Sequence, residues 1–268
     1  MLTSLLTGFI LSCFMGFAGY YKSALSKSGV VGAIIVGTAI FGIGGWRWGL
    51  ILLTFFVSSS LLSRFKEDRK AVISEKFDKG NQRDIWQAFA NGGIGALIAL
   101  ANLIWPANPW LWIAFLGAMG TVNADTWATE IGTLSRATPR SITTGKQVSP
   151  GTSGGITPLG TLAALFGALL IGFVAWLSRP SQLGIGVSLL FLAGLGGLAG
   201  AFFDSLLGAT YQTIYQCPRC QRETERKTCC EAPTRRIRGF PWLNNDWVNL
   251  LSSIIGAIVA VLLGFVIT

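Results

Sequence analysis

Three acidic residues, Asp125, Glu130 and Asp204, lie at the ends of long apolar segments, whereas the other acidic residues of the chain lie in hydrophilic stretches. An ionised side chain inside a lipid bilayer costs at least a few kcal/mol, so such residues are rare there unless they have a function. Carboxylate oxygens are ligands that Mg²⁺ prefers, and Mg²⁺ is usually held by one or two carboxylates together with the phosphates of a substrate. The three acids therefore predict a Mg²⁺-dependent catalytic site that handles phosphate.

Asp125 and Glu130 belong to the sequence GTVNADTWATEIG, residues 120–132, which also contains the amide of Asn123. Helical spacing places Asn123 and Glu130 on one face and Asp125 on a neighbouring face. A regular helix therefore does not aim both carboxylates at one point. Either the helix breaks near Gly132, or the two acids bind different parts of one ligand. The alternative to a metal site is a salt bridge from one of these acids to a basic loop residue.

Asp204 is flanked at four-residue intervals by Gly200 and Gly208, so the three residues share one stripe of a helix. Glycine has no side chain, which leaves room beside the carboxylate for another backbone or for a ligand. The predicted topology places Asp204 at a membrane depth similar to that of Asp125. The alternative is a hydrogen bond from a neighbouring helix to Asp204.

Residues 131–156 form a hydrophilic segment that is rich in Gly, Ser and Thr and contains three cations and no acid. Backbone N–H groups of glycine-rich turns and cationic side chains bind phosphate, as does the N-terminus of a helix such as the one predicted to follow. The segment is not a Walker A loop, because Gly145-Lys146 is followed by Gln147. A flexible linker is the alternative. The predicted phosphate-binding residues are Asn123, Arg136, Arg140, Lys146, Ser153, Gly154, Gly155 and Thr157.

A second polar segment leads into the fourth apolar run. Gln87 and Asn91 are four residues apart and share a helical face, and Arg83 and Asp84 precede them. We expect Arg83 and Asn91 to contact the same phosphate-bearing ligand. A solvated row of polar residues is the alternative.

The last hydrophilic segment contains Cys217-Pro-Arg-Cys220 and the adjacent pair Cys229-Cys230. In a reducing compartment a Cys-x₂-Cys pair indicates zinc rather than a disulfide. Adjacent cysteines are not the usual second half of a zinc site, so a structural Zn²⁺ held by the four thiolates and free thiols both remain open. The chain contains no histidine, which excludes histidine-based acid–base catalysis and Ser–His triads.

Long apolar runs recur along the chain, which is 51% hydrophobic and 12% charged. This charged fraction is about half that of a typical soluble domain. Runs of roughly 17–25 apolar residues can cross about 30 Å of hydrocarbon as helices. The sequence therefore predicts an all-α, polytopic transmembrane bundle that forms a single domain over residues 1–268. The eight predicted spans lie near residues 1–20, 28–46, 48–63, 86–105, 110–130, 157–177, 183–210 and 247–267.

Basic residues orient the predicted bundle. All of the 21 Lys and Arg residues except Arg47 and Arg179 fall in the segments that follow odd-numbered spans. Since positively charged loops stay in the cytoplasm, both termini are predicted on the non-cytoplasmic side, with cytoplasmic loops near residues 64–85, 131–156 and 212–246. The net charge of +9 is then an orientation signal that needs no nucleic-acid partner. All three intramembrane acids lie near the cytoplasmic face in this topology.

Five segments, spread over nearly the whole chain, are specific enough to indicate a family. They are GNQRDIWQAFANGG, NADTWATEIG, TGKQVSPGTSGGITPLGT, FFDSLLGATYQ and CPRC. Together they resemble the transmembrane protein 19-like family of integral membrane proteins, which includes the phytyl-phosphate kinase of plants and cyanobacteria. The resemblance implies transfer of a nucleotide γ-phosphate to an isoprenoid, phytyl-like monophosphate, as in tocopherol biosynthesis. It also implies a bacterial inner membrane or a photosynthetic membrane as the location.

A lipid-phosphate kinase fits the polar residues. Such an enzyme needs acids for Mg²⁺, donors for phosphates of the nucleoside triphosphate and of the isoprenoid phosphate, and a groove for the isoprenoid chain within the membrane lipid. An acceptor phosphate is already ionised, so no histidine base is required. The competing hypothesis is a transporter or flippase of an anionic lipid or an ion. Carrier sites lie near the bilayer midplane, whereas the acids of this chain gather near one face.

Overall fold

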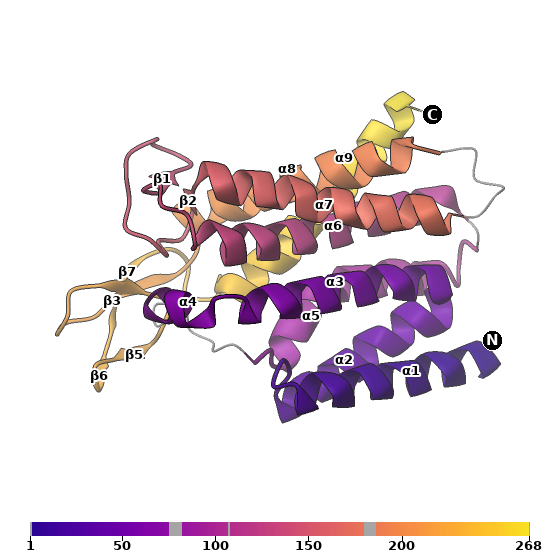
Figure 1. The fold of residues 1–268 in the computed structure, drawn as a ribbon, viewed down its shortest axis with the longest axis horizontal. Coiled ribbons are helices and arrows are strands. Elements are labelled where there is room, and N and C mark those ends of the chain that lie inside the picture. The colour runs from indigo at the N-terminus through magenta and orange to yellow at the C-terminus, as the bar shows by residue number, and fades with distance from the viewer. Residues whose placement is uncertain (1, 75–81, 107, 180–185, 268) are drawn as a thin grey trace.

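The computed structural model describes residues 2–74, 82–106, 108–179 and 186–267, and these residues are mainly helical (Figure 1). Residues 75–81 of the predicted loop near 64–85 and the first residues of the predicted span 183–210 lie outside the described residues. The helices are α1 (Leu2–Tyr21), α2 (Lys27–Ala39) with the π-helical turn η1 (Ile40–Gly44), α3 (Trp46–Arg64), α4 (Glu67–Ser74), α5 (Ile85–Ala101), α6 (Pro109–Gly132), α7 (Pro158–Ser178), α8 (Ser188–Thr210) and α9 (Asn245–Ile267).

The predicted fold class, a polytopic transmembrane helical bundle, is confirmed. The number of helices that are long and apolar enough to cross a membrane is smaller than the eight predicted spans. Each of the eight predicted spans coincides with a helix, the second with α2 and η1 together. Within the described ranges, six helices are long and apolar enough to cross a membrane: α1, α2 with η1, α3, α7, α8 and α9. The helix α5 has 17 residues and falls short in length. The helix α6 has 24 residues, but its last third carries the polar residues of the sequence NADTWATE.

Side chains in the loops fix where several helices begin. Ser26 caps α2 by accepting a hydrogen bond from Gly29 N at 3.1 Å. Asp84 and Gln87 form a reciprocal capping box at the start of α5. Asn108 and Thr157 cap α6 and α7, and a proline follows each of them in the first turn. Such caps satisfy backbone N–H groups that have no partner within the helix.

The helices form two groups joined by α3 and α5. The first group contains α1, α2 and η1, and the second contains α6, α7, α8 and α9, which all pack on one another except for the α7–α9 pair. The helix α3 contacts η1, α6 and α7, and α5 contacts α2, η1, α6 and α9. The main apolar core lies at this junction, where the Trp48 and Phe115 rings are 4.4 Å apart and Trp112 is buried beside them.

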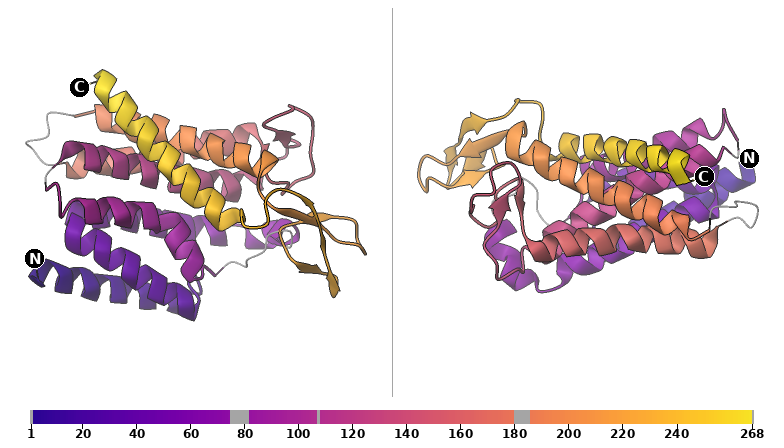
Figure 2. Two further views of the ribbon diagram at one scale, coloured as in Figure 1. Left: turned by 180° about the vertical axis from the view of Figure 1, so that it is seen from behind. Right: turned by 90° about the horizontal axis from the view of Figure 1, so that it is seen from above.

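Both chain termini lie at one end of the bundle, and α4 and the strands lie at the opposite end (Figures 1 and 2). This arrangement agrees with the prediction that the termini share one side of the membrane and that the long polar loops share the other. Which of the two sides is cytoplasmic is inferred from the positive charge of the loops alone.

The loops contain short strands that the all-α prediction did not include. The strands β1 (Arg140–Ser141) and β2 (Gly155–Ile156) form an antiparallel pair within the loop between α6 and α7. The loop between α8 and α9 contains a three-stranded sheet in which β3 (Ile214–Gln216) lies between β4 (Glu223–Thr224) and β7 (Arg235–Arg238). A hairpin of β5 (Thr228–Cys229) and β6 (Ala232–Pro233) completes this loop.

Candidate functional site

A polar cavity of about 620 Å³ lies at the strand-bearing end of the bundle. Its walls are the ends of α3 through α9 together with the loops that precede α5, α7 and α9. The structure therefore gathers side chains that are far apart in the sequence. The predicted site residues that line it are Arg83, Asn91, Asp125, Glu130, Ser153, Gly154, Gly155, Thr157 and Asp204.

Close packing of two helices brings Asp125 and Asp204 together. Gly200 of α8 lies against Thr121 of α6, where an added Cβ would be 2.1 Å from the threonine Oγ1. Asp125 and Asp204 each follow this contact by one helical turn, both line the cavity, and their negative charges repel. Only a residue without a side chain permits this approach. The glycine stripe beside Asp204 thus positions a pair of carboxylates.

The partners of these two carboxylates differ. Asp204 Oδ2 accepts a hydrogen bond from Ser252 Oγ of α9 at 3.2 Å. Asp125 has no hydrogen-bond or ion-pair partner among the residues that the structure describes, although it faces the cavity beside a second acid. Two neighbouring carboxylates that lack a protein cation attract a cation from solution. The pair has the oxygen donors that suit Mg²⁺.

Glu130 is bound by the protein itself. Its Oε2 pairs with Lys70 Nζ at 2.5 Å, and its Oε1 accepts a hydrogen bond from Ser63 Oγ at 2.6 Å. The helix α6 runs without a break through both acids and ends at Gly132, so the first of the two alternatives does not bring Glu130 to Asp125. Both acids line the cavity from different faces of this helix. The salt bridge named as an alternative for this acid is present.

Lys70 was not among the predicted site residues. It lies on α4, is only 7% exposed, and its Nζ also donates to the carbonyl oxygens of Leu62 and Ser63 at 2.8 Å each. Carbonyl groups at the end of a helix lack partners within that helix and carry partial negative charge. Lys70 therefore joins the C-terminal end of α3 to the C-terminal end of α6. It also lines the cavity.

Arg83 provides a second cation at the cavity wall. Its Nη1 donates to Ser60 Oγ at 3.3 Å, and its guanidinium lies over the Phe55 ring at 5.6 Å. Its backbone bonds to Ala24 and Ser26 hold it in place. Burial lowers the pKa of Arg83 and the charge of Glu130 opposes that change, but a guanidinium stays protonated at neutral pH.

The loop between α6 and α7 contributes its glycine turn and not its cations. Ser153, Gly154 and Gly155 line the cavity, and Thr157 does so while capping α7 with a 3.0 Å bond to Gly160 N. In contrast, the three cations of this loop are exposed and do not line the cavity, and Arg140 alone of the three belongs to the β1–β2 pair. These residues are Arg136, Arg140, whose Nη1 donates to Gly145 O at 2.8 Å, and Lys146.

Asn123 is fully buried and does not line the cavity. Its Nδ2 donates to Gly167 O of α7 at 2.7 Å, and its Oδ1 accepts from Ser58 Oγ of α3 at 3.0 Å. A buried amide with both groups satisfied joins neighbouring helices. Asn123 therefore supports the site from behind and does not reach a ligand in the cavity.

Further polar side chains, which the sequence did not single out as site residues, complete the cavity. Glu225 Oε1 accepts hydrogen bonds from Gln212 Nε2 at 2.8 Å and from Ser153 Oγ at 3.2 Å, so the last loop is tied to the glycine turn. The polar run Asn244-Asn245-Asp246 at the start of α9 is a sequence signal that could have indicated this part of the site, because Arg83 also lies in a polar segment at the start of a helix. Other polar lining residues are Glu67, Gln87, Thr126, Thr129, Ser205 and Asn249.

An apolar crevice of about 60 Å³ adjoins the polar cavity. It lies between α1, α2, α3 and α5, and the two spaces share Arg83, Gln87 and Asn91 as wall residues. A ligand with a charged head and an apolar chain matches this junction, because each part would meet groups of its own polarity. The other lining residues are Ser12, Met15, Leu25, Ala33, Val36, Gly37, Leu52, Phe55, Phe56, Ala88 and Gly92.

Comparison with known proteins agrees with the motifs. The family model described as integral membrane protein DUF92 matches residues 10–257. The chain belongs to this family of integral membrane proteins. The predicted family relationship is therefore confirmed.

Three relatives illustrate the range of the family. Protein PGR of Arabidopsis thaliana is 32% identical over an alignment of 266 positions, which covers 91% of this chain and 90% of that protein. The membrane protein MJ0933 of Methanocaldococcus jannaschii is 31% identical, with 98% and 95% covered. The chloroplastic protein VTE6 of Arabidopsis thaliana is 27% identical over 248 residues, with 90% and 66% covered. No solved structure matches this chain.

Proposed function

We propose that this integral membrane protein is a Mg²⁺-dependent kinase that transfers the γ-phosphate of a nucleoside triphosphate to an isoprenoid, phytyl-like monophosphate, giving the diphosphate. The observation that carries the proposal is the Asp125–Asp204 pair, in which Asp125 has no protein partner among the described residues, in a polar cavity that adjoins an apolar crevice at Arg83. The resemblance of the chain to a family that includes phytyl-phosphate kinase supports the same reaction.

The donor set of the cavity fits Mg²⁺. Asp125 and Asp204 would hold the ion, and Ser252 orients Asp204 through its hydrogen bond. When bound, Mg²⁺ neutralises the charge of the transferred phosphoryl group. We place Glu130 outside this pair, because Lys70 and Ser63 already bind its two oxygens.

Other residues of the cavity wall provide the donors that phosphates need. Arg83 would bind the acceptor phosphate, and Gln87 and Asn91, one turn apart on α5, would bind its remaining oxygens. The Ser153–Gly155 turn and the capped start of α7 after Thr157 would hold the nucleotide phosphates with backbone N–H groups.

The reaction asks little covalent chemistry of the protein. An oxygen of the acceptor phosphate forms a bond to the γ-phosphorus, while the bond from that phosphorus to the β–γ bridging oxygen breaks and the nucleoside diphosphate leaves. The attacking oxygen is already deprotonated, so the absence of histidine is compatible with this step. Positioning and charge neutralisation supply most of the rate enhancement in such transfers.

The test is product formation by the purified protein supplied with phytyl phosphate, Mg²⁺ and a panel of nucleoside triphosphates, with the diphosphate detected by mass spectrometry. Asp125→Asn and Asp204→Asn should each reduce kcat by about 10³-fold or more, because each removes a charge from the Mg²⁺ pair. Asp68→Asn, the same change at an exposed position of α4, should keep wild-type activity. Unfolding temperatures separate loss of chemistry from loss of fold.

Two results would contradict the proposal. Full activity of both Asp125→Asn and Asp204→Asn would exclude the carboxylate pair from the reaction. Uptake of labelled isoprenoid phosphate into sealed vesicles without nucleotide would support the transporter instead, since a carrier needs access from both sides and no phosphoryl donor.

A further inference from the structure

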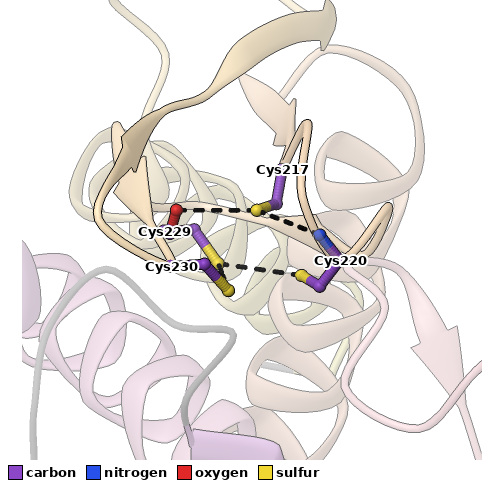
Figure 3. A group of neighbouring side chains, drawn as sticks. All are labelled: Cys217, Cys220, Cys229 and Cys230. Atoms are coloured by element: carbon purple, nitrogen blue, oxygen red, sulfur yellow. Dashed lines mark hydrogen bonds between the residues drawn. The ribbon is translucent and has the colours of Figure 1, made fainter.

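Four cysteines of the loop between α8 and α9 meet at one point outside the cavity (Figure 3). Their sulfur atoms all lie within 4.8 Å of one another, and all four are free thiols. Cys220 Sγ is 3.9 Å from Cys229 Sγ, and Cys229 Sγ is 3.7 Å from Cys230 Sγ. Four thiolates around one Zn²⁺ with bonds of about 2.3 Å have sulfur atoms about 3.8 Å apart, so these two sulfur–sulfur separations match a shared tetrahedral ion.

The backbone from Cys217 to Gln221 forms a tight turn around the sulfur atom of Cys217. Cys220 N donates to Cys217 Sγ at 3.5 Å, and Gln221 N donates to Cys217 O at 3.0 Å. Gln221 has a left-handed backbone with φ of 59°. Cys217 is fully buried, and its Sγ also contacts Cys229 O at 3.5 Å, which joins the two halves of the cluster.

The second pair occupies a turn that cysteine does not favour. Cys229 pairs with Ala232 in the β5–β6 hairpin, so its two-residue turn consists of Cys230 and Glu231, with φ of 51° and 59°. Such turns favour Asn-Gly, because most residues other than glycine and asparagine are strained at positive φ. This turn lets two adjacent cysteines face the same point, and a bound ion would offset the strain.

The charge of the surrounding loop is complementary to the cluster. Zn²⁺ with four thiolates has a net charge of minus two. The loop carries seven Lys and Arg residues between Arg219 and Arg238 and three acids in the same stretch. These cations can therefore balance a tetrathiolate ion in addition to orienting the chain in the membrane.

We propose that Cys217, Cys220, Cys229 and Cys230 bind one structural Zn²⁺ that closes the loop between β3 and β7. Four protein ligands leave no open position for a substrate, so the ion stabilises structure and does not take part in catalysis. In the sequence, Glu225 lies between the two cysteine pairs. It accepts hydrogen bonds from Gln212 and Ser153 at the cavity wall. The ion would thus fix the position of this wall.

The test is the metal content of the purified full chain in detergent, measured by mass spectrometry of the metal. The expected result is one Zn²⁺ per chain, falling to background in Cys217→Ser and in Cys220→Ser, and unchanged in Cys13→Ser, whose cysteine lies on α1. Replacement of the Zn²⁺ by Co²⁺ should give an intense thiolate-to-metal absorption band in the wild type and in Cys13→Ser.

Three results would overturn the proposal: background zinc in wild-type protein whose four thiols all react with an alkylating agent, a mass that reveals a disulfide among them, or full zinc binding by the serine variants. None of these measurements uses phosphoryl transfer. The zinc site therefore stands or fails separately from the proposed kinase activity.

Discussion

An acidic side chain within an apolar helix is stabilised either by a protein cation or by a ligand, and the two acids of α6 differ in this respect. Glu130 pairs with Lys70, whereas Asp125 faces the cavity beside Asp204 without a partner among the described residues. Burying an ion pair contributes less to stability than its short distance suggests, but removal of one partner leaves a buried charge. Glu130 and Lys70 therefore form a positioning pair, and Asp125 remains available to a cation.

This difference predicts the behaviour of Glu130→Gln. Lys70 would keep its two carbonyl acceptors and lose its counter-ion, so the free energy of unfolding should fall by about 2 kcal/mol. This is below the about 3–5 kcal/mol of a fully buried pair, because the Glu130 side chain is 21% exposed. Lys70→Met should have a similar cost, and the double variant should lose less than the sum of the two. Denaturation of the variants in detergent measures these values.

Activity assays on the same variants distinguish positioning from metal binding. If Glu130 acts through Lys70, Glu130→Gln should change kcat only moderately and leave the Mg²⁺ concentration for half-maximal activity unchanged. A large rise in that concentration, with unaltered stability, would show that Glu130 is a metal ligand. Asp125→Asn serves as the reference for the loss of a true ligand.

At the scale of elements, the loop between β1 and α7 contains three glycines with left-handed backbones, Gly145, Gly151 and Gly154, of which Gly145 and Gly154 can be compared directly. Gly154 has φ of +78°, and an added Cβ would lie 2.4 Å from Ala209 Cβ of α8. Gly145 has φ of +67°, and nothing lies within 4 Å of an added Cβ. Gly145 and Gly154 thus both adopt a left-handed backbone conformation, but of these two only Gly154 is in close contact with a helix.

The comparison predicts different outcomes for two equal substitutions. Gly145→Ala should cost about 1–2 kcal/mol from backbone strain alone. Gly154→Ala adds a clash that moves the Ser153–Gly155 turn away from α8, so its kcat/KM should fall by tenfold or more beyond any effect of Gly145→Ala. Steady-state kinetics with limited proteolysis of the loop measures both effects. Equal losses in the two variants would mean that the turn does not form part of the site.

The sequence predicted the transmembrane elements because apolar runs of this length have few other solutions. It also placed Asp125, Asp204, Arg83 and Asn91 in one site, since each lies at the end of an apolar run and the topology brings those ends to one face. It missed Lys70, which meets Glu130 across 60 residues of chain once α4 has folded back. Local sequence contains no signal for such a contact.

The loops were the least predictable part for a related reason. Arg140 and Lys146 belong to a loop with the composition of a phosphate-binding loop, but both side chains are exposed, and Arg140 donates to Gly145 O of its own loop. Whether a cation in a loop faces a cavity depends on strand register and on contacts with other loops. Glu225 illustrates the same point, because its hydrogen bonds to Gln212 and Ser153 decide its position.

The whole molecule combines a polar cavity at one end with an apolar crevice that extends between α1, α2, α3 and α5. The two spaces meet at Arg83, so a phosphate held there would direct an attached chain along the crevice. Burial of each methylene contributes about 0.8 kcal/mol. A volume of about 60 Å³ holds only the first part of an isoprenoid chain, and the rest would lie against the lipid-facing sides of the helices.

This geometry predicts that Ala33→Leu discriminates between substrates by chain length. Ala33 lines the crevice, so a leucine there would displace two or three methylene equivalents and lower kcat/KM for phytyl phosphate by about tenfold or more. A five-carbon isoprenoid phosphate should be affected much less, because its phosphate still reaches Arg83. Val31→Leu, on the same helix but 50% exposed and outside the crevice, should alter neither value. Equal losses for the long and the short substrate in Ala33→Leu would place the isoprenoid chain elsewhere on the protein.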